Sequence, residues 1–209
     1  LIYNGIKKYS QDVFLKRNDY REELGITAET VLICMVANLI PYKGHSDLIK
    51  SAALLESKNK WHIILIGEDS GNIQQSLIEL TKEYKVEDKI SFLGKKNNVP
   101  CYLAASDIGV LTSHQEGFSN ALLESMLAGL PMIVTDVGGN PEAVVDSKTG
   151  YVVPPHNVHE LANKISKIID KPELRKEFGV LGKKRVETKF SLANCVSEYE
   201  KVYDLVLNN

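Results

Sequence analysis

The sequence predicts an α/β fold in which helices cover both faces of a mainly parallel, six-stranded sheet. Short apolar or β-branched runs recur as far as Val153, and stretches compatible with helices separate them. After Pro154 and Pro155 only helical patterns follow. Because strands that alternate with helices build right-handed crossover units, we expect a doubly wound parallel sheet with a C-terminal helical tail.

The six expected strands are short and apolar almost throughout. A half-exposed sheet would alternate apolar and polar residues, whereas strands buried on both faces show continuous apolar runs. The expected strands span residues 31–37, 62–66, 90–93, 108–112, 132–135 and 151–153. Helices must therefore cover both faces of the sheet.

Apolar residues at helical spacing predict the covering helices. Two lie between strands, at 46–57 and 72–84, and three form the tail, at 158–170, 172–189 and 191–207, the last with Ser191 as N-cap.

The first residues form an expected leader. Residues 1–25 combine an irregular stretch with a short helix at 17–24 that Gly25 ends. We expect one unit over residues 1–209, with its core at 31–153 and its tail helices at 157–207. The start, LIYNG, has no signal-peptide pattern and is typical of a cut made inside a longer chain.

Composition excludes several classes of protein. With 25 Lys and Arg against 27 Asp and Glu, a net charge of -2 and a pI near 6.3, the chain lacks the positive charge of a nucleic-acid binder. Its longest apolar runs fall short of the roughly 20 residues of a membrane-spanning helix. Cys34, Cys101 and Cys195 show no CxxC spacing, so we expect neither a disulfide framework nor a zinc site, and a reducing cytoplasmic setting.

Ligands of doubly wound sheets bind beyond the carboxyl ends of the strands, which directs attention to the loops there. The first strand is followed by NLIPYKGH, in which Lys43 and Gly44 come just before a helix. The ammonium of Lys43 would complement an anion, and Gly44 would let a ligand approach the backbone. The alternative is a solvated loop lysine.

The fourth strand is followed by the most informative segment. Ser119 or Asn120 is a good N-cap for a helix at 121–128, and the free amides at its start would bind an anion such as phosphate. Glu124 shares a helix face with small residues and would accept hydroxyl hydrogen bonds, unless it simply faces solvent. Glu116 would face the ligand or complement the helix N-terminus. The other helix face is apolar and consists of Leu122, Leu123, Met126 and Leu127.

Two further loops look like tight turns at the ligand edge. One contains Gly94 and Lys95, and the other contains Gly138 and Gly139, for which we expect positive φ. The sequence has no GxGxxG, P-loop, GxSxG or Asp-x-Asp motif, and its five histidines are scattered. We therefore expect no metal and no cofactor, and in particular no metal that holds the phosphates, and we expect the histidines to be structural or exposed rather than catalytic.

The segment from Glu116 to Glu124, EGFSNALLE, followed by SMLAGLP, resembles the EX7E signature of the family 4 (group 1) glycosyltransferases. The same family order is found in Asn4-Gly5, Lys43-Gly44, IGE at 66–68, FLG at 92–94, TDVGG at 135–139 and KFS at 189–191. The resemblance covers essentially the whole chain. It implies the C-terminal, Rossmann-like, sugar-nucleotide-binding half of a GT-B enzyme, with the acceptor-binding N-terminal domain absent.

The resemblance also implies roles for particular residues. Lys43 would neutralise the donor diphosphate, Glu116 would bind the donor sugar near its 3- and 4-hydroxyls, and Glu124 would hold the ribose. Backbone groups would contact sugar and phosphate at Gly117, Phe118, Ser119 and Asn120. Lys43 and a helix N-terminus would stabilise the leaving diphosphate without a metal.

The implied reaction is transfer, with retention, of a hexose-type sugar from a UDP-sugar to a glycan, lipid or other acceptor in polysaccharide or glycoconjugate biosynthesis. The acceptor would bind the absent domain, toward which the last helix would cross with exposed apolar residues. The full-length protein would be cytoplasmic, and peripheral association with the inner face of the membrane is compatible with the resemblance.

One departure from the family pattern concerns the end of the first strand. The family usually has Gly-Arg there, and the arginine contacts the diphosphate, whereas this chain has Ala37-Asn38. Either Lys43 and the helix N-terminus suffice to bind the diphosphate, or Lys95 takes the place of the missing arginine, or donor binding is weakened. Two alternative functions are a non-catalytic nucleotide-binding module, which Asn38 favours, and a GT-B-related sugar-nucleotide epimerase, which does not account for Lys43 together with the EX7E segment.

Overall fold

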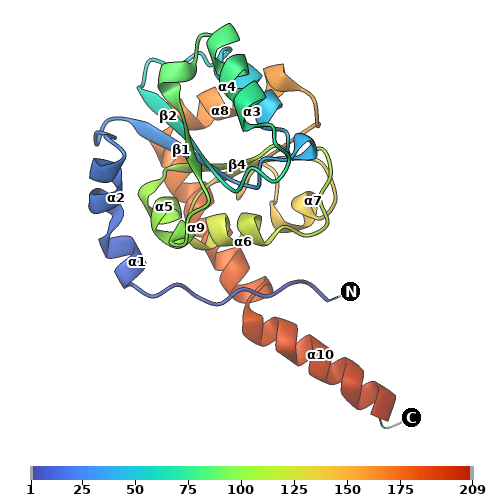
Figure 1. Cartoon of the computed structure of the whole chain (residues 1–209). Helices are drawn as coiled ribbons and strands as arrows, with labels where there is room; N and C mark the ends of the chain where they lie inside the picture. The colour runs from blue at the N-terminus through green and yellow to red at the C-terminus, as the bar shows by residue number, and fades with distance from the viewer. Residues whose placement is uncertain (1, 208–209) are drawn as a thin grey trace.

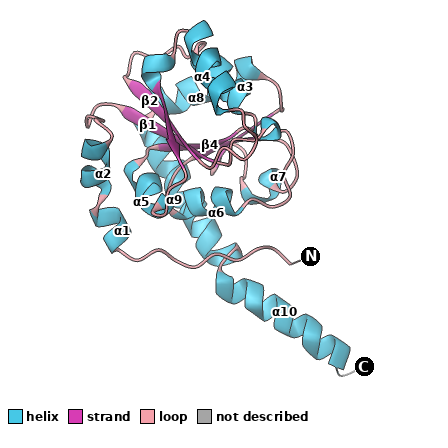
Figure 2. Cartoon of the chain, in the orientation of Figure 1, coloured by secondary structure: helices cyan, strands magenta, loops and turns pink. Residues whose placement is uncertain are grey.

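A computed structural model describes residues 2–207, and its centre is a six-stranded sheet in which all strands are parallel (Figures 1 and 2). The strand order is β3-β2-β1-β4-β5-β6. The strands are β1 (Val31–Val36), β2 (Trp61–Ile66), β3 (Ile90–Gly94), β4 (Ile108–Leu111), β5 (Met132–Thr135) and β6 (Gly150–Val153). All six expected strands are confirmed, with ends that differ by at most one residue.

Helices cover both faces of this sheet, as Figure 2 shows. One face carries α3 (His45–Ala52), α4 (Gln74–Glu83) and α8 (Val158–Asp170). The other carries α5 (Val99–Ala105), α6 (Asn120–Leu127) and α7 (Asn140–Ala143). The long helix α9 (Pro172–Lys189) reaches both, since Phe178 packs in the first core and Val186 in the second. Two 3-10 turns, η1 (Pro41–Lys43) and η2 (Glu87–Lys89), lie in the loops before α3 and β3.

Alternate residues of each strand supply the two cores, as the pleat of a strand requires. In β1, Ile33 and Met35 pack beneath α3 and α8, whereas Leu32 and Cys34 pack against the opposite helices, and all four side chains are at most 1% exposed. Continuous apolar strands are therefore explained by a sheet that has no solvent-facing side.

A tertiary contact and a local cap set two helix ends that the sequence pattern places wrongly. The helix expected at 46–57 ends at Ala52, because the following loop bonds to α8, where Ser57 Oγ and Asn59 Nδ2 donate to Asp170 at 2.6 and 2.8 Å. The helix expected at 72–84 begins at Gln74, because Asn72 has a φ of 52° and the carboxylate of Asp69 caps the first turn.

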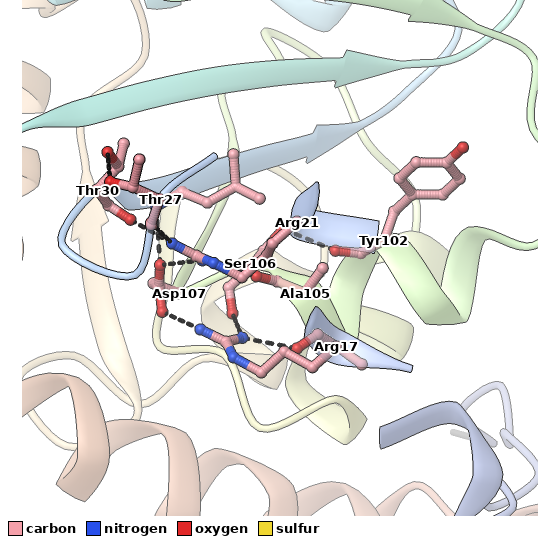
Figure 3. A network of polar contacts seen from close by, with 10 residues as sticks. Arg17, Arg21, Thr27, Thr30, Tyr102, Ala105, Ser106 and Asp107 are labelled. Carbon is pink, nitrogen blue, oxygen red and sulfur yellow. Dashed lines mark hydrogen bonds and ion pairs between the residues drawn. The ribbon is translucent and has the colours of Figure 1, made fainter. Parts of the chain in front are cut away.

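The leader contains two short helices, α1 (Asp12–Leu15) and α2 (Arg17–Glu23), and Gly25 ends the second with a φ of 65°, as expected. Arg17 and Arg21 anchor α2 to Asp107 at the amino edge of the sheet, with Nη to Oδ distances of 2.6 and 3.1 Å (Figure 3). Asp107 also accepts a hydrogen bond from the backbone N–H of Leu32 at 2.8 Å. One carboxylate thus joins the leader to β1 and to the start of β4.

Arg21 carries most of this network because its side chain is buried. Its guanidinium donates to the backbone oxygens of Thr27 and Thr30, both at 2.6 Å, and to that of Ala105 at 3.0 Å. The Ala105 carbonyl belongs to the C-terminal end of α5, where a cation is also favoured by the helix dipole. Loss of Arg21 would leave several buried acceptors unpaired.

The C-terminal helix α10 (Leu192–Leu207) leaves the body of the molecule (Figure 1). Ser191 Oγ accepts a hydrogen bond from the backbone N–H of Asn194 at 3.2 Å, as the expected N-cap does. The apolar stripe of α10 is exposed, with Val196 at 47% and Tyr203 at 64%. This exposure confirms one part of the expectation for the last helix, while its crossing toward another domain stays a prediction. Among residues 2–207, no helix has the length and apolar character needed to cross a membrane.

Replacing Arg21 with Ala tests the anchor. We expect the free energy of unfolding to fall by about 3 to 5 kcal/mol, since Asp107 and several carbonyl groups lose a buried charged partner. Lys16→Ala, at an exposed position beside the same helix, should change it by less than about 0.5 kcal/mol. Urea unfolding of both variants measures this difference, and equal losses would show that the network adds nothing.

Candidate functional site

The strand order reverses between β1 and β4, so the loops that follow these two strands leave the same edge side by side. In the sheet, Ile33 pairs with Ile108 and Cys34 with Gly109. The chain runs outward from β1 through β2 and β3, returns, and continues through β4, β5 and β6. This is the position at which open α/β sheets bind ligands.

The loop after β1 turns through η1 and is pressed against the end of β4. Gly44 has a φ of 72°, and a Cβ atom at this residue would lie 1.9 Å from the carbonyl oxygen of Thr112. The hydroxyl of Thr112 in turn donates to the carbonyl oxygen of Gly44 at 2.9 Å. Glycine is therefore needed for close approach of two backbones, rather than only for access of a ligand.

This approach brings Lys43 to Glu116. Lys43 Nζ lies 2.7 Å from Glu116 Oε1, and Ser113 Oγ donates to the same oxygen at 2.7 Å. The two charged side chains are only 19% and 7% exposed. Lys43 is thus not the solvated loop lysine of the alternative interpretation, and an arriving anion would meet a partly buried cation already held in place.

The start of α6 offers further donors. The N-cap is Ser119, whose hydroxyl accepts a hydrogen bond from the backbone N–H of Leu122 at 3.3 Å, as expected. Within the described chain, the amides of Asn120 and Ala121 have no hydrogen-bond acceptor, as is usual for the first turn of a helix. Ser119 and Ala121 line a cleft that Lys43 also lines.

This cleft has a volume of about 380 Å³ and opens beyond the carboxyl ends of β1, β2 and β4. Four of the predicted site residues line this cleft: Asn38, Lys43, Lys95 and Ser119. Glu116 reaches it through its ion pair with Lys43. Gly94, Gly117, Phe118, Asn120 and Glu124 are not among its lining residues.

Asn38 contributes hydrogen bonding but no charge. Its Oδ1 accepts from the backbone N–H of Glu68 at 3.2 Å, which fixes the loop after β2. Lys95 Nζ lies 3.1 Å from Glu68 Oε2, and both side chains are largely exposed. A second cation is therefore present in the cleft, paired with a carboxylate that sequence reasoning did not place in the site, although the IGE segment at 66–68 is part of the family pattern.

Glu124 is half-buried, and burial raises the pKa of its carboxyl group. Its carbonyl oxygen accepts a hydrogen bond from the hydroxyl of Tyr9 in the leader at 3.3 Å. The expected apolar face of α6 is confirmed, since its four residues are at most 2% exposed. Ser125, one of the small residues beside Glu124, is buried and donates to the carbonyl oxygen of Ala121 at 2.8 Å.

The leader and the glycine turn after β5 both pack on the loop between β4 and α6. Asn4 Nδ2 donates to the carbonyl oxygen of Phe118 at 3.3 Å. The backbone N–H of Gly139 donates to the carbonyl oxygen of Gly117 at 2.6 Å. Gly138 has the expected positive φ of 52°, and a Cβ there would lie 2.0 Å from the carbonyl oxygen of Glu116. The expectation is wrong for Gly139, which has a φ of -84° and is restricted instead by the ring of Phe118.

Three of the histidines lie near the carboxyl edge of the sheet, one buried by itself and two close together. His45 is 1% exposed, and burial lowers its pKa to about 4, so it is a neutral structural residue, as expected. His114 and His156 are far apart in the sequence but lie together in the structure, with ring centroids 3.8 Å apart. Asp47 lies beside both, with its Oδ2 2.8 Å from His114 Nε2. Spacing along the chain gave no sign of this cluster, because its members follow different strands.

The model of the family "Glycosyl transferases group 1" matches residues 16–185, which is most of the chain. The chain belongs to the group 1 glycosyltransferases. Its likeness to GT-B structures confirms the expected Rossmann-like half of that fold, and within larger relatives the chain corresponds to the C-terminal domain.

Individual relatives agree with this membership. This glycosyltransferase chain is 30% identical over 210 residues to the N-acetyl-alpha-D-glucosaminyl L-malate synthase of Bacillus anthracis, covering 100% of the chain and 54% of that protein. It is similar to HepE of Anabaena, solved in complex with UDP, with a TM-score of 0.88 and 25% identity over 97% of the chain and 56% of that structure. The chain thus spans about half the length of these two proteins.

A third similar protein was solved as a separate domain. The C-terminal domain of the group 1 glycosyltransferase LpcC from Francisella tularensis has a TM-score of 0.76 and is 26% identical, over 91% of this chain and 97% of that one. A glycosyltransferase domain of this kind therefore forms an ordered structure without its N-terminal half, which favours experiments on the isolated chain.

The contact between Gly44 and Thr112 can be tested with a matched pair of glycines. Gly44→Ala should lower the free energy of unfolding by at least about 2 kcal/mol more than Gly25→Ala, because overpacking against the Thr112 carbonyl adds to the cost of positive φ. Both glycines have φ near 70°, but nothing lies within 4 Å of a Cβ at Gly25. Urea unfolding of the two variants measures the difference, and equal losses would contradict the close approach.

Proposed function

We propose that this chain is the donor-binding half of a retaining glycosyltransferase and that it binds a UDP-sugar in the cleft beside β1 and β4. The observation that carries the proposal is the partly buried ion pair of Lys43 and Glu116, with a Nζ to Oε1 distance of 2.7 Å at the edge where such sheets bind ligands. The complex of HepE with UDP, and another with UDP-glucose, support the choice of nucleotide.

The diphosphate would lie between Lys43 and the first turn of α6. Lys43 is a cation with limited solvent access, and the amides of Asn120 and Ala121 add positive potential at the helix N-terminus. As the bond between sugar and diphosphate breaks, negative charge grows on the diphosphate, and preorganised donors of this kind stabilise it. No metal ion is needed for this stabilisation.

Glu116 would serve the sugar. In the structure its carboxylate accepts from Lys43 and Ser113, so it is oriented before a ligand arrives. When the diphosphate competes for Lys43, the carboxylate gains free lone pairs that can accept sugar hydroxyls. Gly117 and Phe118 would add backbone contacts, and Glu124, whose carboxyl pKa is raised by its partial burial, would accept the ribose hydroxyls.

Because Asn38 stands where the family usually has an arginine, Lys95 would have a supporting role in diphosphate binding. Asn38 has no charge to offer a phosphate, and its side chain is engaged with the loop after β2. Lys95 lines the same cleft and is 71% exposed, so it can turn from Glu68 toward an anion at little cost. Lys43 and α6 would provide most of the diphosphate affinity, and Lys95 would provide a smaller, salt-sensitive part.

The acceptor would be a glycan or lipid held by a further domain, and transfer would build a polysaccharide or glycoconjugate in the cytoplasm. The curated relative from Bacillus anthracis is about twice as long as this chain, since the chain covers 54% of it. The isolated chain would therefore bind the donor without transferring sugar at a normal rate.

Calorimetric titration of the chain with UDP, GDP and ADP in EDTA tests the proposal. We expect selective binding of UDP that survives chelation and weakens at least about tenfold in Lys43→Ala, since a charged hydrogen bond is lost. Glu124→Gln should also weaken UDP binding, whereas Lys176→Ala, an exposed position on α9, should not. Absence of nucleotide binding, or unchanged affinity in Lys43→Ala, would contradict the proposed site.

A further inference from the structure

We propose that Asp47, His114 and His156 form a binding site for a divalent transition-metal ion. His114 Nε2 and His156 Nδ1 lie 2.8 and 3.7 Å from the same carboxylate oxygen, Asp47 Oδ2. All three potential ligand atoms lie within 4.8 Å of one another. None of the three residues lines the cleft, and none of them has a role in the proposed donor site.

The sheet topology brings these residues together. Asp47 lies in the first turn of α3, which follows β1, while His114 follows β4 and His156 follows β6. All these strands are parallel, so their carboxyl ends meet at one edge. The backbone N–H of His114 also donates to the carbonyl oxygen of Tyr42 at 2.7 Å, which fixes this loop against the segment that carries Lys43.

The donor set suits a zinc-class ion. Two imidazole nitrogens and one carboxylate oxygen are ligands that Zn²⁺ commonly takes in proteins, with a fourth position left for water. With metal to ligand distances near 2.0 to 2.1 Å, ligand atoms of a tetrahedral site lie roughly 3.3 Å apart. The observed separations are close enough that a shift of about 1 Å would complete the site.

Two of the three ligands are largely buried and the third is exposed. The side chains of Asp47 and His114 are 13% and 21% exposed, whereas that of His156 is 66% exposed. Asp47 and His114 are thus held in advance, and His156 can rotate to close the site from the solvent side. His156 also has a φ of 62°, which is rare for a residue other than glycine.

Zinc titration of the chain, prepared without a histidine tag and first stripped with a chelator, tests this inference. We expect one zinc ion per chain, bound with micromolar or tighter affinity. His156→Ala and Asp47→Asn should each weaken binding at least about tenfold, and His159→Ala, an exposed histidine outside the cluster, should not. Cobalt in place of zinc should give the visible absorption of a tetrahedral ion in the unchanged chain but not in His156→Ala.

His156→Ala is the decisive variant, because an exposed side chain can be removed without loss of the fold. Circular dichroism of each variant verifies that it is folded. Zinc affinity that is unchanged in His156→Ala and Asp47→Asn would overturn the proposal, as would the absence of zinc binding at micromolar concentration. Equal losses in His156→Ala and His159→Ala would also overturn it, since they would show binding to exposed histidines in general.

Discussion

The reversal of strand order between β1 and β4 is the constraint on which the site depends. Because these two strands are neighbours and parallel, the loops that follow them must leave the sheet side by side. The contact between Gly44 and Thr112 then presses one loop onto the other, and the ion pair of Lys43 and Glu116 forms across the junction. Residues 73 positions apart in the sequence meet as a result of topology.

The amino edge of the sheet, opposite the candidate site, holds the leader in place. There Asp107 binds Arg17 and Arg21 and accepts the backbone N–H of Leu32, so the leader, β1 and β4 are tied together at their amino ends. The groups of this network hydrogen-bond to one another, whereas the carboxyl edge holds charged groups that a ligand can engage. The edge that ties the leader to the sheet is thus opposite the edge at which we propose that the ligand binds.

The sequence allowed much of this arrangement to be predicted. Continuous apolar runs located all six strands, and Lys43 and Glu116 could be assigned to the same edge because both follow parallel strands. Hydrogen bonds to distant residues, such as the one that Ser57 donates to Asp170, determine helix ends and leave no trace in local periodicity. Residue spacing also does not predict contacts between loops that follow strands which are not neighbours. The cluster of Asp47 with two histidines was therefore not predicted.

Affinities of UDP and UDP-glucose for Glu116→Gln, measured beside Lys43→Met and the double variant, test most directly whether the paired residues divide diphosphate and sugar between them. In Glu116→Gln, Lys43 loses its charged partner, so UDP should bind at least as tightly as to the unchanged chain, while the gain in affinity from the glucose moiety disappears. Lys43→Met should weaken both ligands at least about tenfold, alone or with Glu116→Gln. Loss of UDP affinity in Glu116→Gln, or unchanged UDP affinity in Lys43→Met, would contradict this division of roles.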